Sequence, residues 1–203
     1  MYVPAHFAPH DDHVRELLTH HGAADLITTG PDGLEATMLP FVHDRERGTL
    51  LGHFARNNDH WTRVHGQRCL VIVRGPDSYI SPSWYAAKAE HGRVVPTWNY
   101  VTAHVHGTAT VHDDAGWVAD AVRRLTDHHE ADRPVPWTVE DAPERFVRGQ
   151  LRAIVGVEVR IDRIDAKFKL SQNRPAADID GVITGLRSRG DAQGADAVAT
   201  HRP

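Results

Sequence analysis

The sequence predicts an α+β protein made mainly of β-structure, with an antiparallel β-barrel and helices packed outside it. Strand patterns dominate the first half of the 203-residue chain, and the clearest helix patterns fall between and after later strands. Six or so segments with alternating faces favour a closed or nearly closed barrel, because closure leaves no open sheet edge. A composition of 40% hydrophobic and 25% charged residues is ordinary for a globular protein.

The first half of the chain is predicted to form a helix followed by four strands. Residues 11–21 have apolar side chains at helical spacing, with two aspartates at the N-terminal end. The Gly30–Gly33 stretch is a turn signal between two strands, which indicates a hairpin. The four expected strands cover residues 23–29, 34–42, 49–54 and 69–74.

The second half alternates strands with helical additions. Residues 99–112 alternate apolar and polar side chains, and residues 154–171 read as a long strand or strand pair. Helices are expected at about 114–131, 141–153 and 175–189. We therefore assign residues 1–190 to one domain and expect 191–203, which are small and polar, to form a flexible C-terminal tail.

Composition excludes several classes of function. No apolar run approaches 18 residues, so no membrane span is expected, and the N-terminus lacks a secretory pattern. One cysteine allows no intrachain disulfide, which favours the cytoplasm. The formal net charge of −4, with scattered basic residues, makes direct DNA binding doubtful.

The segment 79–100 concentrates aromatic residues in polar company. It holds two Trp and three Tyr, mixed with Ser, Thr, Asn, Lys and His. Flat apolar faces beside hydrogen-bonding groups suit a planar ligand with a polar edge. A long loop pinned to the barrel by its aromatic side chains is the alternative.

Two further segments offer cationic and amide groups. Gly52–Asn58 ends a strand and begins a helix, so its backbone N–H groups and Arg56 could bind a phosphate. The alternative is an Asn-capped helix with a surface Arg. Lys167–Arg174 ends the last strand and could reach a phosphate or a ring edge, unless it is simply a solvated strand end.

No catalytic or metal motif stands out. Paired cysteines, His-Glu-x-x-His, Gly-x-Ser-x-Gly and the nucleotide-binding glycine loops are all missing. Cys69 lies in an apolar strand, where a thiol is inert. A single neutral His could ligate haem iron, and His53 and His60 are the candidates.

Several blocks resemble the PaiB family, described as FMN-binding negative transcriptional regulators. They are 1–4, 51–58 with Trp61, 78–100, 153–156 and 169–174, which span nearly the whole chain in order. The resemblance implies a split β-barrel of the pyridoxamine-phosphate-oxidase type. It also implies a homodimer with FMN in the groove between the subunits.

The resemblance further implies which residues contact the cofactor. The phosphate would be received by His53, Arg56, Asn57 and Asn58. The flavin ring would be flanked or edged by Trp84, Thr97, Trp98 and Asn99. Lys169 and Gln172 would close the site from the partner subunit.

Two other functions stay open. One is an FMN-dependent oxidoreductase. The other is a haem b enzyme resembling the piperazate synthases, which form an N–N bond, with His53 or His60 as the iron ligand. Ala55 stands where those synthases are expected to carry Asn, which favours the regulator-like branch.

Overall fold

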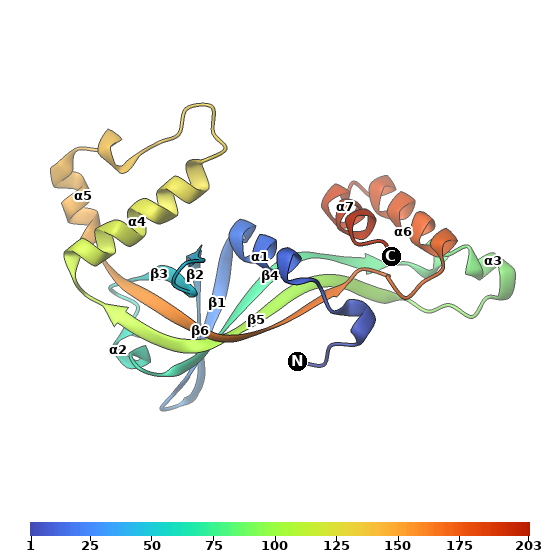
Figure 1. Cartoon of the computed structure of the whole chain (residues 1–203), viewed down its shortest axis with the longest axis horizontal. Coiled ribbons are helices and arrows are strands. Elements are labelled where there is room, and N and C mark those ends of the chain that lie inside the picture. Colours follow the sequence, from blue (N-terminus) through green and yellow to red (C-terminus); the bar gives the residue numbers. More distant parts are fainter. The chain divides into compact units, whose positions relative to one another are not determined.

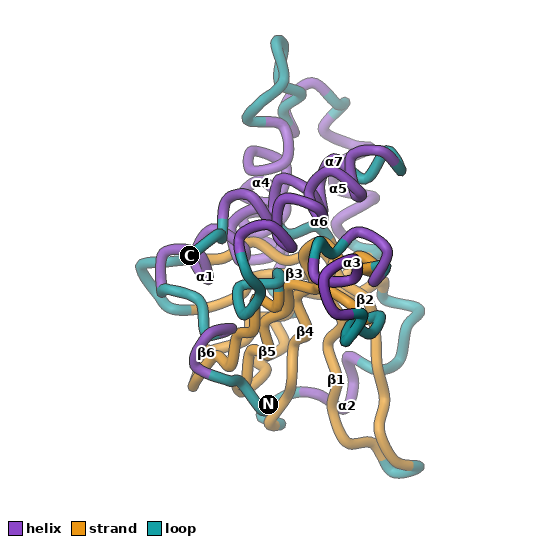
Figure 2. The backbone as a smooth tube through the Cα atoms, turned by 90° about the vertical axis from the view of Figure 1, so that its right-hand side faces the viewer, coloured by secondary structure: helices purple, strands orange, loops and turns teal.

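Six strands close into an antiparallel barrel in the order β1-β2-β3-β6-β5-β4. They are β1 (Ala23–Gly30), β2 (Gly33–Asp44), β3 (Thr49–Ala55), β4 (Arg68–Ile80), β5 (Thr97–His112) and β6 (Ile154–Lys169). Figure 2 shows β5 between β4 and β6. The computed structural model describes all 203 residues, and it confirms the predicted barrel with peripheral helices.

The β1–β2 hairpin forms where the sequence predicts it. Gly30 pairs with Gly33, so only Pro31 and Asp32 form the turn. Gly33 has φ 118°, a conformation that side chains with a Cβ rarely adopt. Pro40 pairs with Ala23, and the next residue already pairs with β3. Pro40 therefore lies where β2 changes partner, a position that tolerates a missing N–H.

The chain divides into two compact units, although the sequence predicts a single domain over residues 1–190. Unit 1 contains residues 1–17, 74–103 and 165–203, and unit 2 contains residues 18–73 and 104–164. The strands β4, β5 and β6 and the helix α1 (Asp11–His20) contribute residues to both.

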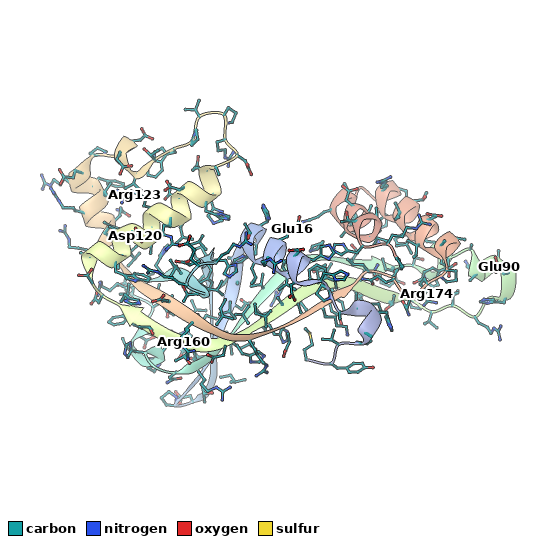
Figure 3. All side chains as sticks on the ribbon, in the orientation of Figure 1. Glu16, Glu90, Asp120, Arg123, Arg160 and Arg174 are labelled. Carbon is teal, nitrogen blue, oxygen red and sulfur yellow. The ribbon has the colours of Figure 1, made fainter.

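In unit 2, β1 and the first part of β4 bury alternate residues, as a barrel requires. It also contains α2 (Trp61–Val64), α4 (Ala115–Glu130), η3 (Val139–Asp141) and α5 (Glu144–Leu151). The apolar stripe of α4 buries Val118, Ala121 and Leu125, and the helix contacts β2 and β3 (Figure 1). Arg123 of α4, which Figure 3 labels, forms an ion pair with Glu140 of η3.

Unit 1 is organised around a second apolar cluster, which includes Ile80, Val101, Phe168, Ile179 and Val198. Its elements are η1 (Ala5–Phe7), η2 (Pro82–Trp84), α3 (Ala87–His91), α6 (Ala176–Ser188) and α7 (Ala192–Thr200). The helices α6 and α7 lie side by side (Figure 1).

The C-terminal segment differs from the predicted flexible tail over residues 191–203. Most of it forms α7, which buries Ala195 and Val198. Asp191 begins the helix, since its carboxylate accepts a hydrogen bond from the Gly194 N–H at 2.8 Å. Apolar contact and a cap together order a segment that is too small and polar to look structured.

No helix of this structure combines the length and the apolar composition that crossing a membrane requires.

Candidate functional site

The residues that the sequence predicts for a cofactor site fall into two sets, one in each unit. Trp84, Thr97, Trp98, Asn99, Lys169 and Gln172 belong to unit 1. His53, Arg56, Asn57 and Asn58 belong to unit 2.

Unit 1 contains a hollow of about 170 Å³ beside the start of β5 and the end of β6. Three of the predicted residues, Thr97, Asn99 and Lys169, line it. The other lining residues are Phe7, Tyr85, Val95, Pro96, Ser171, Asn173 and Arg174. Cationic, aromatic and amide groups therefore meet at one small concave site.

Lys169 supplies a positive charge at this hollow. Its Nζ donates hydrogen bonds to the Thr97 hydroxyl and, at 2.6 Å, to the Trp98 carbonyl. Burial lowers the pKa of Lys169, and the nearby charges of Lys167 and Arg174 lower it further. Neither Lys169 nor Arg174 forms an ion pair with a carboxylate. The hollow thus has a surplus of positive charge that an anion would relieve.

Tyr85 adds an unsatisfied polar group. The Arg174 guanidinium lies 4.7 Å from the centroid of the Tyr85 ring, a cation–π arrangement, and Figure 3 marks Arg174. Tyr85 is buried, which raises the pKa of its phenol, and its hydroxyl has no hydrogen-bond partner. A buried hydroxyl without a partner is costly, so a bound group with a polar atom would stabilise it.

A strained turn forms one wall of the hollow. Ser171 has φ 70°, and it is the only non-glycine residue with positive φ. Its hydroxyl exchanges hydrogen bonds with the Asn99 amide at 3.0 and 3.2 Å. Strained residues held by surrounding contacts concentrate at ligand sites, and this one directly follows Lys169 and Leu170.

Gln172 has a structural role in that turn. Its amide oxygen accepts from the Leu170 N–H, and its amide nitrogen donates to the Phe168 carbonyl, both at 2.7 Å. These bonds satisfy both ends of the amide, and Gln172 does not line the hollow. Gln172 therefore holds the turn, whereas Lys169 lines the hollow.

The two tryptophans of the aromatic segment have different surroundings. A Cβ at Gly181 would lie 1.9 Å from the Trp84 carbonyl, and one at Gly185 would lie 2.3 Å from the Trp84 ring. Trp84 is thus packed closely against α6. Trp98, in contrast, is 54% exposed and meets the Tyr79 ring edge to face, at 6.0 Å between centroids. Of the two, Trp98 offers the open aromatic surface.

The guanidinium group of Arg56, in unit 2, already donates hydrogen bonds to other protein groups. Its Nε donates to the Arg152 carbonyl at 2.8 Å, and Nη2 donates to the Ile154 carbonyl at 3.0 Å. Asp113 accepts from both Nη atoms, which raises the pKa of Arg56. The guanidinium therefore joins the end of β3 to the start of β6, and a phosphate would have to displace Asp113.

Asn57 and Asn58 differ in whether protein groups already bind their side chains. Asn57 is exposed. The Asn58 side chain accepts from the His60 N–H at 3.1 Å and donates to the Thr37 hydroxyl at 3.2 Å. These bonds hold the turn before α2, whose N-cap residue is His60 and which has no side-chain capping bond.

His60 is a structural residue in this arrangement. It is fully buried, and its two ring nitrogens lie 2.8 Å from the Thr28 and Thr37 hydroxyls. Burial lowers the pKa of His60. An iron ligand needs one ring nitrogen directed at the metal, and both are engaged here.

His53 is half-buried on β3, and its Nδ1 is a buried atom without a hydrogen-bond partner. Burial alone lowers its pKa. The structure holds no group of three or more His, Cys, Asp or Glu side chains arranged for a metal ion. Burial also raises the pKa of the Cys69 thiol to about 12, which leaves little thiolate for nucleophilic chemistry.

Of the residues that line the hollow, only Phe7 lies outside the two segments that the sequence singles out, 79–100 and 167–174, and Tyr85 is not among the predicted contacts. Tyr85 belongs to the aromatic segment, but no local pattern shows that its hydroxyl lacks a partner. Phe7 comes from η1, far from the other residues in sequence, and no periodicity relates it to them. Both contributions depend on tertiary packing.

Several known proteins are similar to this chain in sequence. Residues 1–163 match the family described as "Putative FMN-binding domain". "Protease synthase and sporulation protein PAI 2" of Bacillus subtilis is 29% identical, over 93% of this chain and 90% of that protein. An uncharacterized protein of Aspergillus fumigatus is 32% identical, over 79% of each chain.

A solved structure shares the fold at low sequence identity. The FAD and haem binding protein of Mycobacterium smegmatis aligns with a TM-score of 0.59 and 15% identity, over 79% of this chain and 71% of that one. The sequence blocks, the barrel and the family match lead to one assignment. This chain belongs to the PaiB family of flavin-binding split-barrel proteins.

Proposed function

We propose that this protein binds FMN and acts as a PaiB-type negative transcriptional regulator. The observation that supports it best is the hollow in unit 1, where two cations lack carboxylate partners and the buried Tyr85 hydroxyl makes no hydrogen bond. An FMN phosphate would accept hydrogen bonds from these donors. FMN, when bound, would supply redox chemistry at its ring.

Different residues of the chain would bind the phosphate and the ring of FMN. Lys169 and Arg174 would pair with the phosphate, and Tyr85 would donate a hydrogen bond to it. Trp98 and Tyr79 offer an exposed aromatic surface for the ring. Asn99 and Ser171 would hold the wall of the hollow in place.

The size of the hollow supports a homodimer. A volume of about 170 Å³ is below the ~300–1,000 Å³ of sites that enclose a whole ligand of this size. One chain would thus enclose only the phosphate and part of the sugar chain, and a partner subunit would cover the ring. Light scattering should give twice the 22.6 kDa chain mass, and a monomer that retains flavin would contradict this arrangement.

The cofactor assignment is tested by the absorption spectrum of the purified protein. We expect flavin bands in the wild-type protein and about tenfold weaker FMN affinity in Lys169→Gln, because a charged hydrogen bond to phosphate is lost. Lys88→Gln, on exposed α3, is the matched control and should bind normally. A Soret band, or unchanged FMN affinity in Lys169→Gln, would contradict the assignment.

Regulation would act through the flavin or a protein partner, because a net charge of −4 gives little attraction for DNA. The relevant measurement is the transcript profile of a deletion strain. The levels of a set of transcripts should rise in the deletion strain. Complementation with the wild-type gene should lower them again, whereas the Lys169→Gln gene should not. Unchanged transcript levels in the deletion strain would contradict the regulatory role but not the proposed FMN binding.

A further inference from the structure

A second hollow, of about 360 Å³, lies within unit 2 at the start of α4 and the end of α5. It is larger than the hollow of unit 1 and shares no residue with it. Its floor is apolar, formed by Val118 of α4, Leu151 of α5 and Ile154 of β6. Its charged residues are Arg56, Arg148, Arg152 and Asp113.

The charged residues of this hollow leave a positive surplus. Asp113, the one carboxylate, is bound to Arg56. Arg148 pairs with Glu144, one turn away on α5, where both side chains are largely exposed. Arg152 is exposed, and the structure gives its guanidinium no hydrogen-bond acceptor and no ion-pair partner. A ligand with one negative charge could pair with Arg152 directly. It could also compete for Arg148, because an exposed ion pair such as Arg148–Glu144 is weak.

The helix α5 leaves the apolar floor incompletely covered. None of its residues is buried, although Val147 and Leu151 lie on one side of it and are half-buried. A helix that packs through an apolar stripe normally buries that stripe. Apolar surface beneath α5 therefore remains available to a ligand.

From these features we infer that the unit 2 hollow binds a small organic carboxylate with an aromatic or branched apolar body. The apolar body would lie on Leu151 and Ile154, which are only half-buried, beside the buried Val118. Removing the remaining apolar surface of Leu151 and Ile154 from water supplies affinity. The carboxylate would pair with Arg152, whose planar guanidinium matches it in a two-bond geometry. Arg56, fixed by Asp113, forms a rigid wall and does not bind the ligand.

The floor distinguishes this ligand from an inorganic anion. Phosphate or sulfate could pair with Arg152, but it has no apolar surface to place on the aliphatic side chains, so it would leave the floor unused. A neutral aromatic molecule would use the floor and leave Arg152 unpaired. Only a ligand with both parts uses the whole hollow.

Isothermal titration calorimetry on the full chain tests this inference. The probes are phenylacetate, benzoate and isovalerate, with phenylacetamide and inorganic phosphate as comparisons. At least one carboxylate should bind with a dissociation constant of about 1 mM or better, as expected for a ligand of this size. The amide and phosphate should each bind at least about tenfold more weakly.

Two variants assign the binding to the hollow. Arg152→Gln should weaken carboxylate binding about tenfold through the lost ion pair. Leu151→Gln should weaken it through the apolar floor, and circular dichroism checks that each variant is folded. Arg145→Gln, on α5 but outside the hollow, should bind like the wild type.

Three results would overturn the inference: no heat with any carboxylate, equal affinity for phenylacetamide, or unchanged affinity in Arg152→Gln. The proposed FMN binding depends on residues of unit 1 and is measured by flavin absorption. The calorimetric result for unit 2 therefore neither supports nor contradicts FMN binding.

Discussion

At the scale of single residues, His60 shows how a side chain that looks like a ligand can be part of the barrel. Both of its ring nitrogens are engaged by threonine hydroxyls, one from β1 and one from β2. Asn58 bonds both the His60 N–H and the Thr37 hydroxyl. The histidine therefore joins the β1–β2 hairpin to the segment that follows β3.

His60→Leu should lower the free energy of unfolding by about 1–3 kcal/mol, because the buried Thr28 hydroxyl loses its partner. The same variant should retain its flavin, since His60 lies outside the hollow of unit 1. Urea denaturation measures the first effect and the absorption spectrum measures the second. His129→Leu, at an exposed position on α4, controls for loss of an imidazole. Loss of the cofactor from a folded His60→Leu protein would contradict this role.

At the scale of elements, α6 depends on two glycines that let Trp84 approach closely. A methyl group at Gly181 would lie 1.9 Å from the Trp84 carbonyl, which no rotation of a side chain can relieve. The backbone of η2 or of α6 would have to move. Helix propensity alone would favour alanine at this position, so the packing requirement opposes the local preference.

Gly181→Ala should destabilise the protein by about 1–3 kcal/mol, the usual range for overpacking. Gly149→Ala on α5 is the matched change, because a methyl group there would meet no neighbouring atom within 4 Å. That variant should be more stable by about 0.5–1 kcal/mol through helix propensity. Chemical denaturation of the two variants should therefore give shifts of opposite sign. Shifts of the same sign would show that the Trp84 contact does not control α6.

The element scale also shows what local sequence patterns could and could not predict. The hairpin turn, the strands and the helices α4, α5 and α6 follow from turn residues and periodicity. The helix α7 does not, because alanine and glycine carry no visible stripe. Its one signal is Asp191, a capping residue that also accepts a hydrogen bond from the Ser78 hydroxyl at 2.6 Å.

At the scale of the whole molecule, the candidate site was only partly predictable. Lys169 and Thr97 line the same hollow of one chain, because the end of β6 lies beside the start of β5, whereas the family resemblance implied that Lys169 closes the site from the partner subunit. The family resemblance implied Arg56 and Gln172 as cofactor contacts, but Asp113 and nearby backbone groups already use their hydrogen-bonding atoms. Residue type indicates what a side chain can bind, whereas tertiary structure decides whether a protein group binds it first.

The whole molecule should also lose stability in mild acid. Burial lowers the pKa of five histidines below the ordinary 6.5, namely His21, His43, His53, His60 and His201. Below pH 6.5 the unfolded chain takes up protons at these residues that the folded protein resists, so stability is full above pH 6.5 and falls below it. Carboxylates with lowered pKa, such as Asp113, lose their contribution only at still lower pH.

Urea unfolding at pH 7.5 and 5.5 measures this loss. Each proton taken up only by the unfolded chain adds a slope of about 1.4 kcal/mol per pH unit. His53→Gln should reduce the slope, because burial alone lowers the pKa of His53 and the variant has nothing to protonate. Asn57→Gln, at an exposed position without a titratable side chain, should leave the slope unchanged. Equal free energies of unfolding at the two pH values would mean that the five histidines take up protons in the folded protein as well. Water would then reach these side chains despite their burial.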